Sequence, residues 1–117
     1  MAAIRHPAQY GAAIVLGGYF QPEFSPRRPF QVTPALNRAY DLVATVARHP
    51  PPLLVWLETS HSDPVSYPST KAFLAAARAP MSVHALLLSH AGHRMSLWDG
   101  ELPAALDWLG ASDPAFS

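Results

Sequence analysis

Three short runs of mainly apolar residues constrain the fold of this chain more than any other feature of its sequence. They are residues 11–16 (GAAIVL), 53–57 (LLVWL) and 83–88 (VHALLL). None shows the alternation of polar and apolar residues that marks a strand with one face in water. Continuous runs of this length are instead typical of strands that are covered on both faces, as in parallel sheets. The runs therefore predict three buried, parallel strands.

Helix-like stretches separate and follow these runs. Residues 34–48 place apolar side chains at three- and four-residue spacing, after Thr33 as a suitable N-cap and Pro34 as a suitable first residue. Residues 69–79 are rich in alanine, and residues 98–109 place apolar side chains on one face. Strand and helix thus alternate three times, which predicts an α/β fold with three parallel strands and flanking helices.

Length and charge narrow the class of protein. At 117 residues we expect residues 1–117 to form a single domain, in which the proline-rich stretch 22–34 is a long surface loop. Eight basic residues balance eight acidic ones, so the clustered positive charge of a nucleic-acid-binding protein is not expected. No apolar run approaches the roughly 18 residues that a membrane span needs. The absence of cysteine excludes disulfides, thiolate catalysis and cysteine zinc sites.

The first sixteen residues predict that the domain continues beyond this chain. Residues 1–6 have helical character and are stopped by Pro7, yet they supply less than two turns and no N-cap. A strand at 11–16 that is buried on both faces needs a neighbour along its far edge, because an exposed apolar edge invites aggregation. We therefore expect a missing upstream part. The alternative is that a partner chain or a second copy covers this edge.

Residues that can carry chemistry follow the second and third predicted strands, in the stretches 58–64 (ETSHSDP) and 89–94 (SHAGHR). In an open parallel sheet, functional residues gather at the carboxyl ends of the strands. Asp63 and His93 can form a pair there, in which the carboxylate fixes the imidazole tautomer and stabilises the imidazolium. Gly92 allows a tight turn before the histidine. From the residues alone, a simple turn at Asp63 and an ordinary loop histidine explain the same pattern.

Metal binding and nucleophilic catalysis are the other chemistries to consider in these loops. His61, Asp63, His90 and His93 are candidate metal ligands, although the two histidines of the second loop straddle a glycine instead of sharing a helix face. No nucleophile accompanies the pair, because the chain has no G-x-S-x-G elbow and no cysteine to replace it. His84, inside the third run, is expected to be a hydrogen-bonded core residue.

Two long segments resemble a known family. AAIRHPAQYGAAIVLGGYF and HAGHRMSLWDGELPAALDWLG are similar to the C-terminal part of the esterase family of α/β-hydrolases that includes S-formylglutathione hydrolases, enterochelin esterases and feruloyl esterases. In that family a nucleophile elbow opens a helix whose end is similar to residues 3–7, and a strand similar to 11–20 follows. A later strand precedes the acid, and the last strand precedes a histidine and a Trp- and Leu-rich helix. The resemblance covers nearly the whole chain in order, and 91–109 is its most specific part.

The resemblance implies the C-terminal half of an α/β-hydrolase fold and a serine carboxylic-ester hydrolase. It further implies that Asp63 is the triad acid and His93 the triad base, with a small-molecule ester as substrate and no cofactor. The order of acid and then histidine agrees with this fold. The matching elbow would lie just before Met1, so we expect the chain to lack the nucleophile and to be inactive alone. The alternative function is a non-catalytic remnant or interaction module that forms homo-oligomers through the open strand at 11–16.

Overall fold

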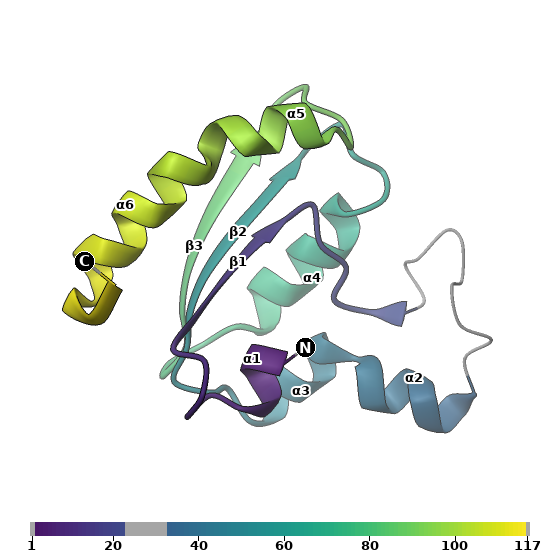
Figure 1. The fold of residues 1–117 in the computed structure, drawn as a ribbon. Helices are drawn as coiled ribbons and strands as arrows, with labels where there is room; N and C mark the ends of the chain where they lie inside the picture. Colours follow the sequence, from purple (N-terminus) through teal and green to yellow (C-terminus); the bar gives the residue numbers. More distant parts are fainter. Residues whose placement is uncertain (1, 23–32, 117) are drawn as a thin grey trace.

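A computed structural model describes residues 2–22 and 33–116, in which a parallel three-stranded sheet lies between helices (Figure 1). In chain order the elements are α1 (Ala2–Arg5), β1 (Ala12–Leu16), α2 (Pro34–Tyr40), α3 (Leu42–Arg48), β2 (Leu54–Ser60), α4 (Tyr67–Ala76), β3 (Ser82–Leu88), α5 (Met95–Trp98), the 3-10 turn η2 (Asp99–Glu101), α6 (Leu102–Ser112) and the 3-10 turn η3 (Pro114–Phe116). This arrangement confirms the predicted α/β class. Most of the predicted loop 22–34, residues 23–32, lies outside the described residues. Within the described part of the chain, no helix combines the length and apolar character needed to cross a membrane.

The sheet has the order β1-β2-β3, so β2 is its central strand. Both pairings are parallel, and their register places Trp56 opposite Ile14 on one side and His84 on the other. Because the strands run in the same direction, the loops that follow them meet at one edge of the sheet. This edge carries both of the loops in which the sequence predicts functional residues.

The main core lies between one face of the sheet and helices α3 and α4. Val55 and Leu57 of β2 are buried there with Val46 of α3 and Phe73 of α4. The rest of this cluster comes from the loops and from the start of α3: Phe20, Leu42, Leu53 and Met81. Each fully buried side chain of this kind contributes roughly 1.5–3 kcal/mol, so this layer holds the central strand and α4 in place.

Helix α6 lies on the opposite face of the sheet, and α5 lies at the carboxyl ends of the strands (Figure 1). Trp56 is buried on this side, with its ring 6.0 Å from that of Trp108 in α6 and 4.5 Å from that of His84 in β3. His84 itself is exposed. The prediction of a buried, hydrogen-bonded His84 is wrong, because β3 is an edge strand and the imidazole stacks on Trp56 without being enclosed.

Only β2 is covered on both faces. Its residues 55–60 are all buried, whereas β1 is half-buried throughout and β3 is a mixture of exposed and half-buried residues. The prediction of three strands buried on both faces is therefore wrong for β1 and β3. Both lie at the edges of the described sheet, where the helices cover less of each face.

The stretch 34–48, predicted as one helix, is two helices that are separated at Asp41. This residue has extended backbone angles, and its carboxylate accepts a hydrogen bond from Ala44 N at 2.8 Å, which caps α3. Leu42 N donates to Phe20 O at 2.9 Å, in the loop after β1. The break therefore joins the start of α3 to the edge of the sheet where the loops meet.

The predicted helix 98–109 begins earlier and ends later than expected. Helix α5 begins at Met95, the 3-10 turn η2 follows it, and α6 continues to Ser112. Pro103 lies in the first turn of α6 and has no amide hydrogen for the hydrogen-bond ladder. The interruption at η2 is consistent with this missing donor.

Candidate active site

Asp63 lies in the turn that leads from β2 to α4, and its carboxylate is fixed by backbone amides. Asp63 N donates to Ser60 O at 2.9 Å, and Tyr67 N at the start of α4 donates to Asp63 O at 3.2 Å. The carboxylate oxygen Oδ1 accepts hydrogen bonds from Val65 N at 2.9 Å and from Ser66 N at 3.1 Å. A short acidic side chain that binds the amides two and three residues further on is typical of a turn that starts a helix. The residue is fully buried.

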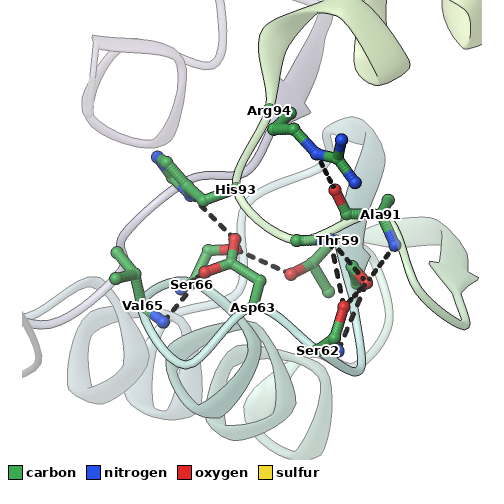
Figure 2. Close-up of polar contacts among 10 residues, drawn as sticks. Thr59, Ser62, Asp63, Val65, Ser66, Ala91, His93 and Arg94 are labelled. Carbon is green, nitrogen blue, oxygen red and sulfur yellow. Dashed lines mark hydrogen bonds and ion pairs between the residues drawn. The ribbon is translucent and has the colours of Figure 1, made fainter.

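His93 lies in the loop after β3, and its ring reaches the Asp63 carboxylate. The preceding Gly92 has φ +61°, in the left-handed region, which lets the chain turn sharply at this point. Nδ1 of His93 lies 2.7 Å from Oδ2 of Asp63, and Figure 2 shows the two side chains pointing toward each other. The side chain of His93 is 41% exposed while that of Asp63 is 0% exposed. The predicted hydrogen-bond contact is therefore present, with the acid beneath the surface and the imidazole at it.

Two hydroxyl groups form a chain of hydrogen bonds that ends at Asp63, and the carboxylate sets the direction of these bonds. Ser66 Oγ lies 2.5 Å from Asp63 Oδ2, and Thr59 Oγ1 lies 2.7 Å from Ser66 Oγ. An ionised carboxylate only accepts hydrogen bonds, so Ser66 donates to Asp63 and Thr59 donates to Ser66. By the same rule the hydrogen of the neutral His93 ring is on Nδ1. Its Nε2 atom then carries the lone pair that a general base needs.

The environment of Asp63 keeps its carboxyl group ionised. Burial acts to raise its pKa, but the hydrogen bonds that the ionised form accepts outweigh burial and hold the pKa below its ordinary value of 3.8. These hydrogen bonds come from the Ser66 hydroxyl, the His93 ring and the amides of Val65 and Ser66. At neutral pH Asp63 is therefore an anion that can stabilise a positive charge on His93.

Nε2 of His93 points away from Asp63 (Figure 2), and two aromatic rings lie beside the imidazole. The ring of Tyr19, in the loop after β1, has its centroid 6.3 Å from that of His93. The ring of Trp98, in α5, meets the imidazole edge to face at 4.7 Å. Within residues 2–22 and 33–116, no hydroxyl group is hydrogen-bonded to Nε2. Among the described residues, the site therefore consists of a buried carboxylate and an imidazole whose second ring nitrogen has no hydroxyl partner.

The other candidate residues of the two loops do not join this pair. The ring of His61 packs on Tyr67 at 4.7 Å, and His90 is exposed. Among the described residues, no three His, Cys, Asp or Glu side chains lie close enough together to hold a metal ion. Of the four candidate metal ligands, the structure brings together only Asp63 and His93.

The hydroxyl groups that support the pair were missed by sequence reasoning. Residues 58–60 belong to β2, not to the loop after it, and Thr59 and Ser60 are fully buried together with Ser66. The one signal in the sequence is density, since five of the eleven residues 59–69 carry an aliphatic hydroxyl group. No local pattern shows which of these hydroxyl groups face the acid.

Glu58 is a second buried carboxyl group at the same end of β2. It is 1% exposed, and neither carboxylate oxygen has a hydrogen-bond partner. Burial, helped by the nearby negative charge of Glu101, raises the pKa of Glu58 from 4.5 to about 7. The indole N–H of Trp56 acts in the opposite direction, although it does not meet the geometry of a hydrogen bond.

Comparisons with models of known families, with curated proteins and with solved structures give no match to this chain. The structure itself defines an α/β protein in which a buried aspartate holds an exposed histidine at the carboxyl edge of a parallel sheet.

Proposed function

We propose that this chain is the C-terminal portion of a serine carboxylic-ester hydrolase with the α/β-hydrolase fold, from the esterase family that its two segments resemble. The observation that carries the proposal is the 2.7 Å contact between Nδ1 of His93 and Oδ2 of Asp63. In a Ser-His-Asp triad the buried acid binds Nδ1 of the histidine, and the nucleophile faces Nε2. The burial of Asp63 and the outward direction of Nε2 fit these two roles.

The topology of the sheet also supports the proposal. The acid follows β2 and the histidine follows β3, which is the chain order of the α/β-hydrolase fold. Within the described residues, β1 pairs with β2 alone, so its other edge is open to a further strand. An upstream part of the sheet, carrying the nucleophile, has a place to pair along that edge.

In the proposed reaction, a serine hydroxyl from outside this chain attacks the carbonyl carbon of the ester. Nε2 of His93 takes the serine proton as the new oxygen–carbon bond forms, and Asp63 stabilises the imidazolium. The tetrahedral intermediate then expels the alcohol, which receives that proton, and an acyl-serine remains. Water attacks the acyl-serine in the same way, which releases the acid and restores the serine. The amides that stabilise the oxyanion are placed outside this chain as well.

The reading frame upstream of Met1 gives the decisive test. The proposal requires a G-x-S-x-G motif roughly ten residues before Met1. Expressed with that segment, the protein should hydrolyse p-nitrophenyl acetate, and His93→Ala or replacement of the motif serine should lower kcat by about 10⁴-fold or more. An upstream frame without the motif, or activity that survives both substitutions, contradicts the proposal.

The 117-residue chain alone should show no hydrolysis that depends on His93. Its rate with p-nitrophenyl acetate should equal that of the His93→Ala chain. His90→Ala is the matched control, because His90 is an exposed histidine of the same loop. A rate that is equally high in the unmodified chain and in His90→Ala, and well above that of His93→Ala, would show that the chain holds its own nucleophile.

A self-associating interaction module is the second candidate function, and the open edge of β1 favours it. Ile14, Val15 and Leu16 are only half-buried, and a second copy that paired along this strand would cover them. Light scattering distinguishes the two candidates. A stable dimer in which the amides of β1 resist hydrogen exchange supports the module, whereas a monomer with exchanging β1 amides speaks against it.

A further inference from the structure

Ser60 connects the two loops that carry the acid and the histidine. It is the last residue of β2, three positions before Asp63, and it is fully buried. Its Oγ lies 2.9 Å from Ala91 N and 3.3 Å from Gly92 N, which belong to the two residues that precede His93. One side chain of the acid's strand therefore binds the backbone of the histidine's loop.

The hydrogen-bond roles of Ser60 and its neighbour Ser62 follow from the capacity of a hydroxyl group, which is two lone pairs and one hydrogen. Three amides are directed at Ser60 Oγ, those of Ala91 at 2.9 Å, Ser62 at 3.2 Å and, as the weakest of the three, Gly92 at 3.3 Å, so both of its lone pairs are used. Its hydrogen therefore goes to Ser62 Oγ, 3.0 Å away. Ser62 Oγ also accepts from Gly92 N at 3.0 Å, and the longer contact from Gly92 N to Ser60 Oγ is the second branch of a bifurcated bond.

The histidine loop is closed on itself, so the contact at Ala91 is passed on to His93. Arg94 Nε donates to Ala91 O at 3.1 Å, which joins the two ends of the segment 91–94 (Figure 2). Gly92 supplies the sharp turn inside this segment. Because the imidazole is partly exposed, few neighbouring side chains hold it in place. A shift of the segment 91–94 therefore moves the ring away from the carboxylate.

We propose that Ser60, together with Ser62, is a positioning residue that holds His93 at hydrogen-bonding distance from Asp63. The proposal rests on the proposed esterase function only in treating Asp63 and His93 as catalytic. Ala91 is 6% exposed, so loss of the Ser60 hydroxyl leaves its buried amide without a partner. Movement of the loop that brings this amide into contact with water then lowers the free energy, because the amide regains a hydrogen bond. The catalytic histidine moves with it.

Nuclear magnetic resonance of the 117-residue chain with ¹⁵N-labelled histidine measures this contact without any ester hydrolysis. In the unmodified chain we expect the hydrogen of His93 on Nδ1, with a resonance shifted downfield by the carboxylate. In Ser60→Ala this proton should exchange with solvent at least about tenfold faster, because the contact with Asp63 forms for less of the time. Ser69→Ala is the matched control. Ser69 is equally buried and accepts one backbone hydrogen bond, from Phe20 N at 2.8 Å, so its loss should leave the Nδ1 proton unchanged.

A second background separates positioning from a general loosening of the fold. If Ser60 acts through the contact with Asp63, Ser60→Ala should change the His93 spectrum little in a chain that already carries Asp63→Asn. Equal changes in both backgrounds overturn the proposal. So does an absent Nδ1 resonance in the unmodified chain.

Ser62→Ala keeps the test decisive if Ser60→Ala does not fold. Ser62 is exposed, and its removal takes away the 3.0 Å bond to Gly92 N, so a smaller acceleration of the same proton is expected. An unchanged proton in the folded variant overturns the role of the serine pair. An accelerated proton in a chain whose extended form is inactive instead supports the positioning role and contradicts the esterase.

Discussion

Glu58 should make the stability of this fold depend on pH, and Glu58→Gln should remove that dependence. The carboxyl group is 1% exposed at the end of the central strand, and neither of its oxygens has a hydrogen-bond partner. Burial first, and then repulsion by Glu101, raise its pKa from 4.5 to about 7, and the Trp56 indole offsets only part of this. The folded state therefore favours the neutral acid.

The sign and size of the effect follow from proton binding. In the unfolded chain Glu58 has its ordinary pKa of 4.5, so between pH 4.5 and about 7 the folded state keeps a proton that the unfolded state has lost. Stability falls as pH rises through this window; the contribution is full below pH 4.5 and gone above about pH 7. At about 1.4 kcal/mol for each unit of pKa, the whole contribution is about 3 kcal/mol. About 2–3 kcal/mol of it is lost between pH 5 and pH 8.

Urea unfolding followed by circular dichroism at pH 5 and pH 8 measures this contribution. Glutamine is neutral at both values, so the free energy of unfolding of Glu58→Gln relative to the unmodified chain should rise by about 2–3 kcal/mol from pH 5 to pH 8. Glu101→Gln is the control: it removes the repulsion and leaves the burial, so it should weaken the pH dependence without abolishing it. Parallel pH profiles for the unmodified chain and Glu58→Gln would show that Glu58 ionises as easily in the fold as in the unfolded chain, and would refute the reasoning.

The turn glycines, the Asp63 carboxylate and the edge strand give three more measurable outcomes. Gly17 and Gly92 both have φ +61°, but an added Cβ would lie 2.3 Å from the Trp98 ring at Gly17 and 4.0 Å from the nearest atom at Gly92. In urea unfolding, Gly17→Ala should therefore lower the free energy of unfolding by about 1–3 kcal/mol more than Gly92→Ala does. Equal losses in the two variants would show that the Trp98 ring moves aside freely. Because folding lowers the pKa of Asp63, the ionised carboxylate stabilises the fold above pH 3.8, and this contribution is lost as pH falls through the pKa of the folded state. Asp63→Asn should therefore make the free energy of unfolding depend less on pH in acid, and an unchanged dependence contradicts the pKa shift. Hydrogen exchange should be faster in β1 than in β2, because β2 alone has strands on both sides among the described residues, and equal protection would point to a partner along the edge of β1.

The alternation of strand and helix could be predicted because the apolar runs and the helical spacing that indicate it are made of residues that are close together in the sequence. The bounds of β2 could not. Residues 58–60 are polar and resemble a loop, yet they extend the strand and are buried. Their burial depends on partners that are distant in the sequence, such as the amide of Ala91 for Ser60, or on loss of charge, as at Glu58. A rule that reads polarity as exposure fails where polar groups are satisfied by the tertiary structure.

The break between α2 and α3 shows the same dependence on distant contacts. The spacing of apolar residues in 34–48 fits one helix, and nothing in that stretch other than Asp41 suggests a stop. The amide of Leu42 donates instead to Phe20 O, in a loop that lies more than twenty residues earlier in the chain. An aspartate within a helical pattern can cap a new helix when a contact of this kind draws the next amide out of the ladder.

Asp63 and His93 could be paired from the sequence because loops after neighbouring parallel strands meet at one edge of a sheet. That rule brings the two loops together, but it does not set a distance of 2.7 Å between two side-chain atoms. The acid is fixed from its own side, by the turn into α4 and the hydroxyl of Ser66. The histidine is exposed, and its loop is fixed from the acid's strand, through Ser60. The distance between Asp63 and His93 therefore depends on hydroxyl groups of the β2–α4 segment. The donor and acceptor roles of these groups are set only by the partners that the fold supplies.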